Sequence, residues 1–301
     1  MQQPRVSVIV PTYARPTQIQ TCVKSLCDAN YPKDLWELVV VDDGSAEPVS
    51  DCLQGFNTQL NLTCLRQTNK GPGAARNFGA QNATGEILVF TDDDCVPEVD
   101  WLPRLVDAVS QDDTVLAGGK TLNGISDNPY SEASQLMIDF LDDYFSRQHT
   151  SMRFFTSNNM ACRALDFRAL GGFDEEFGTG AGEDRDFARR WIQSGRMLTD
   201  APSAIIKHMH RLDFASFVRH HFDYGAGACR FRLVSSKQAE NPNQLQSPSF
   251  YLRLIAYPMS INKPNRFTLC LLMLVMQIAT IFGFISELIM SSPFFAVIKS
   301  K

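Results

Sequence analysis

The sequence predicts an α/β fold built on a mostly parallel central sheet flanked by helices. Residues 6–10, 38–41 and 87–90 are continuous apolar runs. Such runs are typical of strands that are buried on both faces, as in parallel sheets. Segments with helical apolar spacing lie between the runs, and this alternation of strand and helix favours parallel pairing.

The first hundred residues repeat this alternation in order. Ile19, Cys22, Val23 and Leu26 recur at helical spacing, so a helix is expected over 17–29. The expected strands are 6–10, 38–41, 62–65 and 87–90. Two more helices are expected: one begins in the glycine-containing loop 70–79, and the other covers 101–109.

The second half has a weaker pattern. A strand is expected over 156–162, a short helix over 164–170, and a second helix over 183–194 that Gly195 ends. A short strand, 204–207, leads into His208. The polar residues 235–249 are expected to form a linker, followed by an interfacial segment over 248–261.

An apolar segment lies near the end of the chain. Residues 267–286 contain no charged side chain, and this length is close to the ~20 residues that a membrane-spanning helix needs. We expect membrane association; a buried helix or a dimer-forming helix is the alternative. Lysines or arginines lie on both sides of the segment, so their distribution does not decide its orientation.

Composition excludes some classes of function. The 301 residues carry a net charge of −5 and no long basic run, so nucleic acid is not an expected partner. Eight cysteines are scattered without a C-x-x-C pair, which favours reduced thiols in the cytosol. The first strand begins almost at once, so no signal peptide is expected, and the catalytic part is expected on the cytoplasmic face of a membrane.

Three consecutive carboxylates, Asp92, Asp93 and Asp94, follow the strand at 87–90. On an extended chain, Asp92 and Asp94 alternate and point the same way. Acids at the carboxyl end of a buried parallel strand repel one another and need a cation. Mg²⁺ or Mn²⁺ would neutralise them, and a nucleotide diphosphate is the usual second partner of such an ion. The alternative is an acidic turn that starts a helix.

Other polar motifs leave alternatives open. Asp42 and Asp43 can recognise a base or ribose, or form a β-turn with Gly44. The loop at 71–73 could start a dinucleotide fingerprint, but Arg76 stands in place of its third glycine and the loop does not follow the first strand. These two departures argue against a Rossmann dehydrogenase.

Two further groups are candidates for catalysis and metal binding. Glu183 and Asp184 open a helix, where an ionised carboxylate can act as a general base or simply cap the helix. His208 and His210 would share a face of an extended chain, so either could complete the metal site. Histidines in this position can equally be surface or core residues.

Taken together, the motifs resemble family 2 glycosyltransferases of the GT-A fold. In order they are Val10-Pro11-Thr12-Tyr13, Val41-Asp42-Asp43-Gly44-Ser45, Gly71 with Ala75-Arg76-Asn77 and Gly79, Asp92-Asp93-Asp94, Gly171-Gly172-Phe173-Asp174-Glu175, and Gly182-Glu183-Asp184 with His208. The resemblance covers about residues 6–210.

The resemblance implies transfer of a sugar, with inversion, from a nucleotide-diphosphate donor to an acceptor hydroxyl. Pro11, Thr12 and Tyr13 with Asp43 would hold the base, and Arg76 and Asp93 would also belong to the donor site. Asp92 would engage the ribose, Asp94 a divalent cation, and Asp184 would be the base. His208 would assist the metal or diphosphate, with His210 as a fallback. A UDP-sugar is the expected donor, and a glycan or lipid-linked molecule the acceptor.

The chain departs from the processive polysaccharide synthases. It lacks their Gln-x-x-Arg-Trp signature, because residues 187–191 keep only the Arg-Trp end. A single-addition enzyme is therefore expected. Two other hypotheses remain: a phosphatase that forms an aspartyl-phosphate, and a membrane-attached module that binds nucleotides without catalysis.

Four segments are expected along the chain. Residues 1–115 form the nucleotide-sugar-binding half and 116–233 the acceptor-binding and catalytic half of one globular domain. Residues 234–262 form a linker and interfacial segment, and 263–301 form an apolar, membrane-associated tail.

Overall fold

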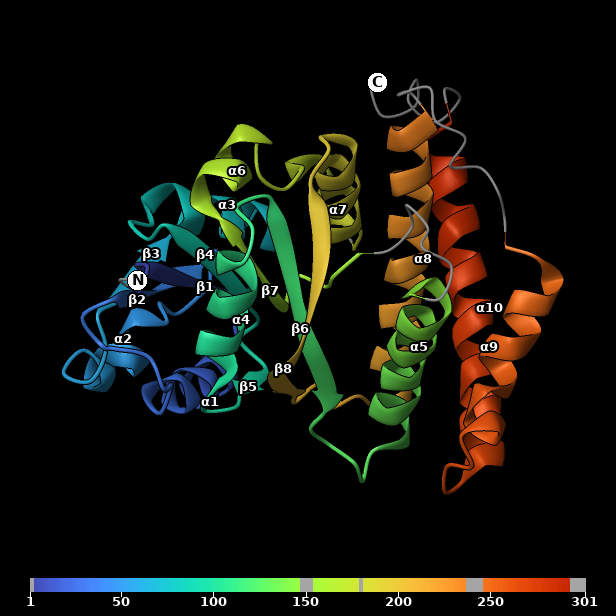
Figure 1. Cartoon of the computed structure of the whole chain (residues 1–301). Helices are drawn as coiled ribbons and strands as arrows, with labels where there is room; N and C mark the ends of the chain where they lie inside the picture. Colours follow the sequence, from blue (N-terminus) through green and yellow to red (C-terminus); the bar gives the residue numbers. More distant parts are fainter. Residues whose placement is uncertain (1–2, 147–153, 179–180, 237–245, 293–301) are drawn as a thin grey trace, which may run out of the picture. The chain divides into compact units, whose positions relative to one another are not determined.

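The computed structural model describes residues 3–146, 154–178, 181–236 and 246–292. They group into two compact units. The first contains Met1–Gly124, Phe154–Thr179 and Glu183–Met209, and the second contains Ile125–Arg153, Gly180–Gly182 and His210–Lys301. Figure 1 labels their helices and strands. The expected four-segment division stays a prediction.

The first unit is built on an eight-stranded sheet of order β3-β2-β1-β4-β7-β6-β8-β5. The strands are β1 (Val6–Thr12), β2 (Trp36–Asp42), β3 (Leu62–Arg66), β4 (Ile87–Thr91), β5 (Cys95–Pro97), β6 (Val115–Asn123), β7 (Asn159–Arg163) and β8 (Met197–His208). β3, β2, β1 and β4 are parallel, as the alternating pattern predicts. β7 runs antiparallel to both of its neighbours.

Helices complete this unit. They are α1 (Pro16–Cys27), α2 (Ser50–Leu53), α3 (Pro72–Asn82), α4 (Trp101–Ser110), α6 (Ala164–Ala169) and α7 (Glu183–Gln193), with 3₁₀ turns η1 (Gln54–Phe56) and η2 (Glu175–Phe177). All the helices expected in this part of the chain are present. The expected strand over 204–207 is longer, because β8 begins at Met197 and pairs with β6 through a register shift at Gly119.

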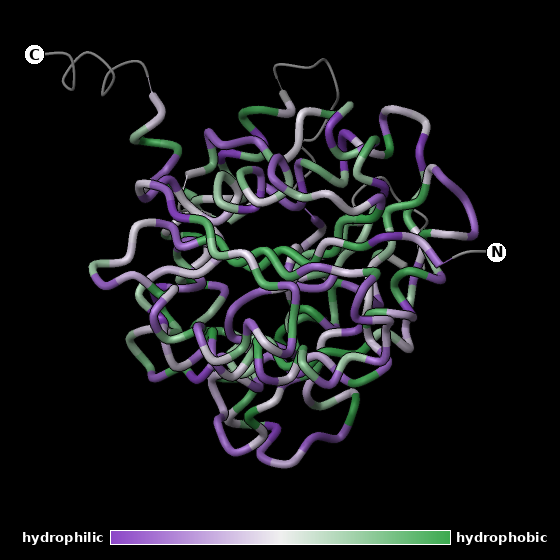
Figure 2. Tube along the Cα trace, turned by 90° about the vertical axis from the view of Figure 1, so that its left-hand side faces the viewer, coloured by the Kyte–Doolittle hydropathy of each residue, from purple (hydrophilic) through white to green (hydrophobic). Residues whose placement is uncertain are grey.

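The central strands are buried on both faces, which explains their continuous apolar sequences. Val8 and Val10 of β1 pack into one apolar cluster with Leu26 of α1 and Leu105 of α4. Ile9, which points the other way, belongs to a second cluster. That cluster also contains Ala75 of α3, Phe167 of α6, and Phe187 and Trp191 of α7. In Figure 2 the apolar runs (green) cross the interior of the view, and polar stretches (purple) gather in the outer loops.

The second unit consists of long helices around a separate apolar cluster. They are α5 (Pro129–Ser146), α8 (Phe214–Ser236), α9 (Pro248–Ser260) and α10 (Arg266–Met290). Phe140, Phe217, Phe250 and Met273 are among the buried residues, with one from each helix. The expected linker is shorter in the structure, since α8 reaches Ser236 and α9 starts at Pro248; residues 237–245 lie outside the described part.

α8 and α10 pack at backbone distance through two glycines. A Cβ atom on Gly225 would lie 1.9 Å from the carbonyl oxygen of Thr280, and one on Gly283 would lie 1.9 Å from that of Phe222. Near the end of α10, Glu287 accepts two hydrogen bonds from Arg230, at 2.8 and 3.0 Å. The two helices are therefore held both by close contact and by an ion pair.

α10 is also the one helix in the described residues that is long and apolar enough to cross a membrane. Part of its surface packs inside the unit, and its exposed large side chains are all apolar. These are Phe267, Leu271, Leu274, Ile278, Ile281, Phe282, Ile285, Leu288, Ile289 and Met290. The predicted C-terminal apolar helix is confirmed.

Candidate active site

The three consecutive acids lie where β4 ends, in a turn closed by a 3.1 Å hydrogen bond from the Cys95 amide to the Asp92 carbonyl. The expected extended alternation of Asp92 and Asp94 is therefore wrong. Because the chain turns, the neighbours Asp93 and Asp94 share a basic partner, Arg15, and Asp92 contacts a different one.

Asp93 is placed by the pairing of β1 with β4. Ile9 lies opposite Phe90, and continuing this register by three residues brings Thr12 opposite Asp93. The Thr12 hydroxyl donates a 2.7 Å hydrogen bond to Asp93 Oδ2, and Arg15 Nη1 lies 3.1 Å from Oδ1. Burial raises the pKa of Asp93 to about 6, although Arg15 acts in the opposite direction.

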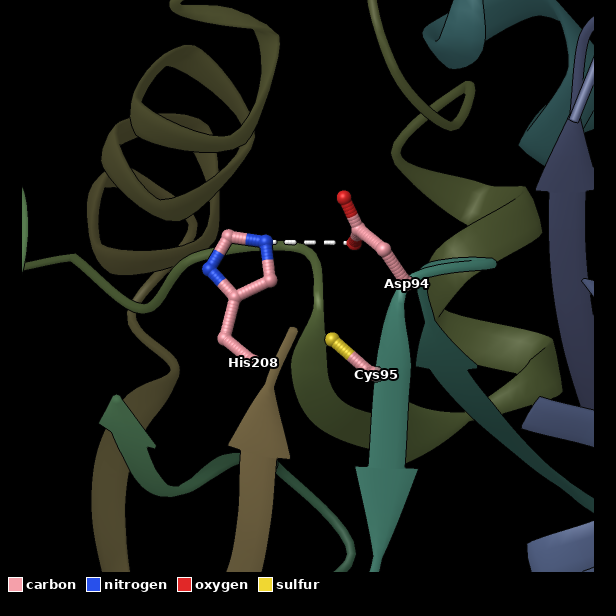
Figure 3. Close-up of side chains that lie close together, drawn as sticks. All are labelled: Asp94, Cys95 and His208. Atoms are coloured by element: carbon pink, nitrogen blue, oxygen red, sulfur yellow. Dashed lines mark ion pairs between the residues drawn. The ribbon is translucent and has the colours of Figure 1, made fainter. Parts of the chain in front are cut away.

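Asp94 meets His208 through the pairing of β5 with β8, which sets Cys95 opposite His208. His208 Nε2 lies 3.1 Å from Asp94 Oδ1. Figure 3 draws this ion pair, with Cys95 beside it. Burial lowers the pKa of His208, but the charge of Asp94 and its hydrogen bond outweigh this, so the pKa is raised overall. Arg15 contacts the other oxygen of Asp94, Oδ2, at 3.1 Å.

Asp94 and His208 suit a divalent cation. One donor atom each from Asp94, Cys95 and His208 lie within 4.8 Å of one another. Mg²⁺ and Mn²⁺ prefer carboxylate oxygens, and Mn²⁺ also accepts imidazole. Burial raises the pKa of the Cys95 thiol, so it stays protonated and is a poor ligand for such hard ions. The fit therefore rests on the carboxylate and the imidazole.

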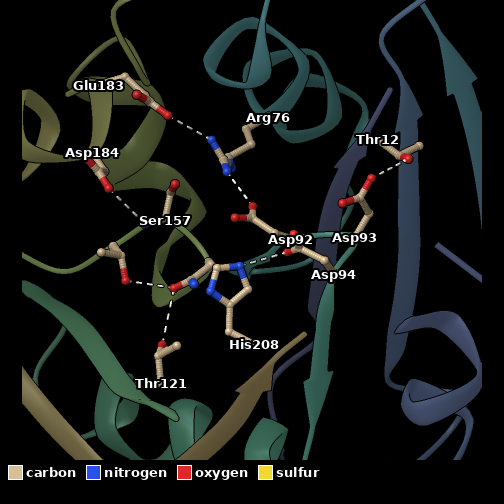
Figure 4. A network of polar contacts seen from close by, with 12 residues as sticks. Thr12, Arg76, Asp92, Asp93, Asp94, Thr121, Ser157, Glu183, Asp184 and His208 are labelled. Carbon is tan, nitrogen blue, oxygen red and sulfur yellow. Dashed lines mark hydrogen bonds and ion pairs between the residues drawn. The ribbon is translucent and has the colours of Figure 1, made fainter. Parts of the chain in front are cut away.

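A buried arginine links the acids to the start of α7. Arg76 Nη2 lies 2.5 Å from Asp92 Oδ1, and its Nη1 lies 3.1 Å from Glu183 Oε1. Only 4% of the Arg76 side chain is exposed, and it also lies over the Phe173 ring. Figure 4 shows this chain of contacts, with Asp94 and His208 beside it. The turn after β4 is thus joined through α3 to the start of α7 by one chain of polar contacts.

Asp184 has a different environment from its neighbour Glu183. It accepts hydrogen bonds from the Ser157 amide at 3.3 Å and the Arg185 amide at 2.7 Å. Burial raises the pKa of Asp184, against the lowering effect of these amides and of Arg76. Its carboxylate has no direct basic partner among the described residues, so it can accept a proton from a bound hydroxyl.

Asp43 was expected to hold the base together with Pro11 and Thr12, which end β1, and Tyr13, which follows it. Asp43 accepts hydrogen bonds from Gln67 Nε2 at 2.8 Å and from the Lys70 and Gly71 amides at 3.0 and 2.8 Å. It therefore fixes the loop that precedes α3. Tyr13 is 51% exposed and is available to a ligand. The nucleotide-binding roles of Pro11, Thr12, Tyr13, Asp43, Arg76 and Asp93 stay predictions.

His210, the expected fallback to His208, belongs to the second unit. Its ring lies 4.9 Å from that of His220. His208 is instead the last residue of β8, and it is the one that contacts Asp94. The role of His210 as a fallback ligand stays a prediction.

A cavity of about 240 Å³ lies beside the acids. Thr17, Gln18 and Thr21 of α1 line it together with Asp93 and Asp94. The first turns of α1 therefore border the same space as the acids. Sequence reasoning missed Arg15 and Cys95. Arg15 follows the first strand, and the one available signal was a basic residue at the same sheet edge as the acids.

The model of the family described as "Glycosyl transferase family 2" matches residues 7–171. The match covers more than half of the chain, including β1, the acids after β4 and Gly171. The chain belongs to glycosyl transferase family 2. The predicted family is therefore confirmed, and membership favours sugar transfer over the phosphatase hypothesis.

Two relatives of this family 2 chain illustrate the range of the match. Glycosyltransferase AglE of Haloferax volcanii is 39% identical over 118 residues, which is 38% of this chain and 39% of AglE. The pre-mycofactocin glycosyltransferase of Mycobacterium tuberculosis is 29% identical over 230 residues, which is 74% of this chain and 46% of the relative. The chain thus spans less than half the length of these curated relatives.

A solved structure confirms the fold of this family 2 chain. The mannosyltransferase PcManGT from Pyrobaculum calidifontis, in complex with GDP-Man and Mn²⁺, superposes with a TM-score of 0.68. The alignment covers 97% of this chain and 89% of PcManGT at 18% identity. At this identity the likeness establishes the GT-A type of fold.

Proposed function

We propose that this chain is a metal-dependent, inverting glycosyltransferase that moves a sugar from a nucleotide-diphosphate donor to an acceptor hydroxyl. One observation carries the proposal: Asp92, the first of the acids after β4, is connected through Arg76 to Glu183, the chain neighbour of Asp184 at the start of α7. A donor held by the acids would therefore lie close to a carboxylate able to deprotonate the acceptor.

The donor would bind at the acid side of the network. Tyr13 is exposed beside the end of β1, and Asp43 fixes the neighbouring loop, so both are suited to hold the base. Asp92 is 30% exposed and can accept a hydrogen bond from the ribose. Arg76 keeps Asp92 in position, because its guanidinium is buried and contacts Glu183 at its other end.

Asp94 and His208 would hold the cation. Their 3.1 Å separation and their ligand types favour this role. When bound there, Mg²⁺ or Mn²⁺ supplies positive charge that stabilises the departing diphosphate.

Asp184 would act on the acceptor side. The acceptor oxygen attacks the anomeric carbon from the face opposite the leaving group, a glycosidic bond forms, and the bond to the diphosphate breaks. Asp184 takes the hydroxyl proton, and the nucleoside diphosphate leaves with the bonding electrons. The raised pKa of Asp184 brings it closer to the operating pH, as a general base requires.

A donor screen tests the proposal. Release of nucleoside diphosphate is measured with UDP- and GDP-sugars, because the PcManGT complex contains GDP-Man. We expect release with Mn²⁺ or Mg²⁺, its loss with a chelator, and weaker metal-dependent donor binding in Asp94→Ala. Equal donor affinity with and without metal would contradict the metal assignment. Nucleotide binding without any hydrolysis or transfer would favour the non-catalytic module.

We also propose membrane association through α10, with a glycan or lipid-linked acceptor and with the catalytic part on the cytoplasmic face. The exposed apolar side chains of α10 support it, since water-exposed apolar surface of this extent is unfavourable.

A further inference from the structure

Every one of the three acids already has a basic partner, and these partners differ in how firmly they are held. Arg76, which pairs with Asp92, is 4% exposed and contacts acids at both ends of its guanidinium. His208, which pairs with Asp94, is 26% exposed and lies in the β5–β8 ladder. Arg76 is thus held by its burial and by two acids, and the backbone of His208 is held by strand pairing.

Arg15 is held less firmly. Its side chain is 46% exposed, and it comes from the connection between β1 and α1. A single nitrogen, Nη1, makes its contacts, 3.1 Å from Asp93 Oδ1 and 3.1 Å from Asp94 Oδ2. The two carboxylates that it joins are buried, with 5% and 9% exposure. A half-exposed cation on a long stem thus neutralises two buried anions.

The contact with Asp94 brings Arg15 close to the place where a divalent cation would bind. A cation that binds Asp94 together with His208 approaches the carboxylate whose other oxygen Arg15 contacts. Two positive groups this close repel each other, so cation binding favours a turn of Arg15 away from the acids. The stem of Arg15 allows that turn, because within the described part of the chain its guanidinium makes only these two contacts.

We propose that Arg15 is an exchangeable counter-ion of Asp93 and Asp94. It competes with the divalent cation for these acids, and once displaced it pairs with the diphosphate of the donor. The guanidinium fork matches phosphate oxygens, and a charge-assisted pair of this kind is among the stronger hydrogen bonds in proteins. The inference rests on the proposed metal and donor site and adds a residue that orders the two binding events.

The exchange has a signature that a purely structural residue lacks. Removing Arg15 takes away a competitor, so the cation alone binds more tightly. Removing it also takes away a partner of the diphosphate, so the nucleotide binds more weakly once the cation is present. The two effects have opposite signs in one variant.

The test measures Mn²⁺ binding by electron paramagnetic resonance and then UDP and GDP binding by calorimetry at saturating Mn²⁺. For Arg15→Gln we expect Mn²⁺ alone to bind about five- to tenfold more tightly. The nucleoside diphosphate that the wild type binds should bind about tenfold more weakly to the variant. Arg15→Lys keeps the charge without the fork, so its Mn²⁺ affinity should stay near that of the wild type while its nucleotide affinity falls.

Arg66→Gln is the matched control. Arg66 is 47% exposed and lies 3.7 Å from the buried carboxylate of Asp42, at the end of the neighbouring strand. Arg66→Gln removes one positive charge from beside a buried carboxylate, as Arg15→Gln does. The Arg66 variant should change Mn²⁺ affinity less than twofold.

Three results would overturn the inference. If the wild type binds Mn²⁺ and Arg15→Gln binds it equally or less well, Arg15 does not compete, and the proposed function still stands. If Arg15→Gln binds Mn²⁺ more tightly but binds the nucleotide as well as the wild type does, the proposed pairing of Arg15 with the diphosphate is wrong. If neither protein binds Mn²⁺ while both keep the wild-type unfolding temperature, the metal part of the proposed function fails together with the inference.

Discussion

Glu183 and Asp184 are adjacent carboxylates with different surroundings. Glu183 is 6% exposed and accepts a hydrogen bond from Arg76, whereas Asp184 accepts only from backbone amides. The Glu183 carboxylate is already occupied by the buried guanidinium of Arg76, so it is poorly placed to contact an acceptor hydroxyl. The difference favours the proposed role of Asp184 in proton transfer, with Glu183 as a positioning residue.

The first prediction concerns Asp184. Asp184→Asn removes the proton acceptor and keeps the shape, so transfer should fall by about 10³-fold or more while nucleoside diphosphate binding changes little. Steady-state transfer rates and calorimetry check the two halves separately. Asp107→Asn, an exposed change on α4, serves as the control. Transfer at more than a tenth of the wild-type rate would remove Asp184 from the role of base.

The second prediction concerns Glu183. Burial, then the charge of Asp184, raises its pKa to about 7, against the lowering effect of Arg76. A group with a raised folded-state pKa stabilises the fold at low pH, and this contribution is lost as the pH rises from about 4.5 to 7. Glu183→Gln cannot ionise, so its stability relative to the wild type should rise by about 1–3 kcal/mol across that window.

Urea unfolding of both proteins between pH 4.5 and 7.5 measures this difference. A constant offset between the two stability profiles would show that the pKa of Glu183 does not change on folding.

Sequence reasoning located some site residues and missed others for a physical reason. Asp92 to Asp94 and His208 follow apolar runs, and Asp184 opens a helix, so local pattern marks them. The contact of Arg15 with Asp93 joins residues 78 positions apart, and that of Arg76 with Glu183 joins residues 107 apart. Such pairs depend on strand order and register, which no single window of sequence contains.

At the scale of elements, the strands were the easier part to predict. A run such as residues 87–90 is buried on both faces wherever it lies in the sheet. The direction of β7 was not predictable in this way, because antiparallel and parallel neighbours bury the same apolar side chains. α8 was missed because it contains Gly225 and Gly227, which lower helix propensity.

Those glycines lead to the third prediction. Gly225→Ala places a Cβ atom 1.9 Å from the Thr280 carbonyl oxygen, so α8 and α10 must move apart. We expect a loss of about 1–3 kcal/mol of folding free energy, measured by urea unfolding. Gly55→Ala is the control, because no atom lies within 4 Å of the added Cβ. Equal stability of the two variants would mean that the close approach of α8 and α10 contributes nothing.

At the scale of the whole molecule, the family match and the apolar surface fall on different units. The match covers 7–171, much of it in the first unit, and α10 lies in the second. The apolar character of α10 was evident from composition. The burial of only one side of α10 was not evident from composition, because that burial depends on which helices pack against α10.

The fourth prediction tests membrane association. Replacing Leu271, Ile278 and Ile285 with glutamate puts three charges on the exposed side of α10, where these residues are 60%, 46% and 45% exposed. Sedimentation with vesicles of mixed neutral and anionic lipids should fall at least tenfold. Leu165→Glu changes a 79% exposed leucine of α6 and should leave sedimentation unchanged. Sedimentation of the triple variant at the wild-type level would exclude α10 as the contact.

The glycine contact between α8 and α10 has a consequence for how the protein can meet lipid. Because Phe222 lies against Gly283, the exposed Asp223 and Arg219 of α8 run beside the uncharged stretch of α10. A helix that pierced the bilayer would carry both charges into hydrocarbon, at roughly 2.5–3.5 kcal/mol each. We therefore expect α10 to lie flat in one leaflet. Fluorophores attached in turn at Leu271, Ile278 and Ile285 should then all report the same shallow depth when they are quenched from within the bilayer. In a helix that crosses the bilayer, the middle position, Ile278, would be the deepest.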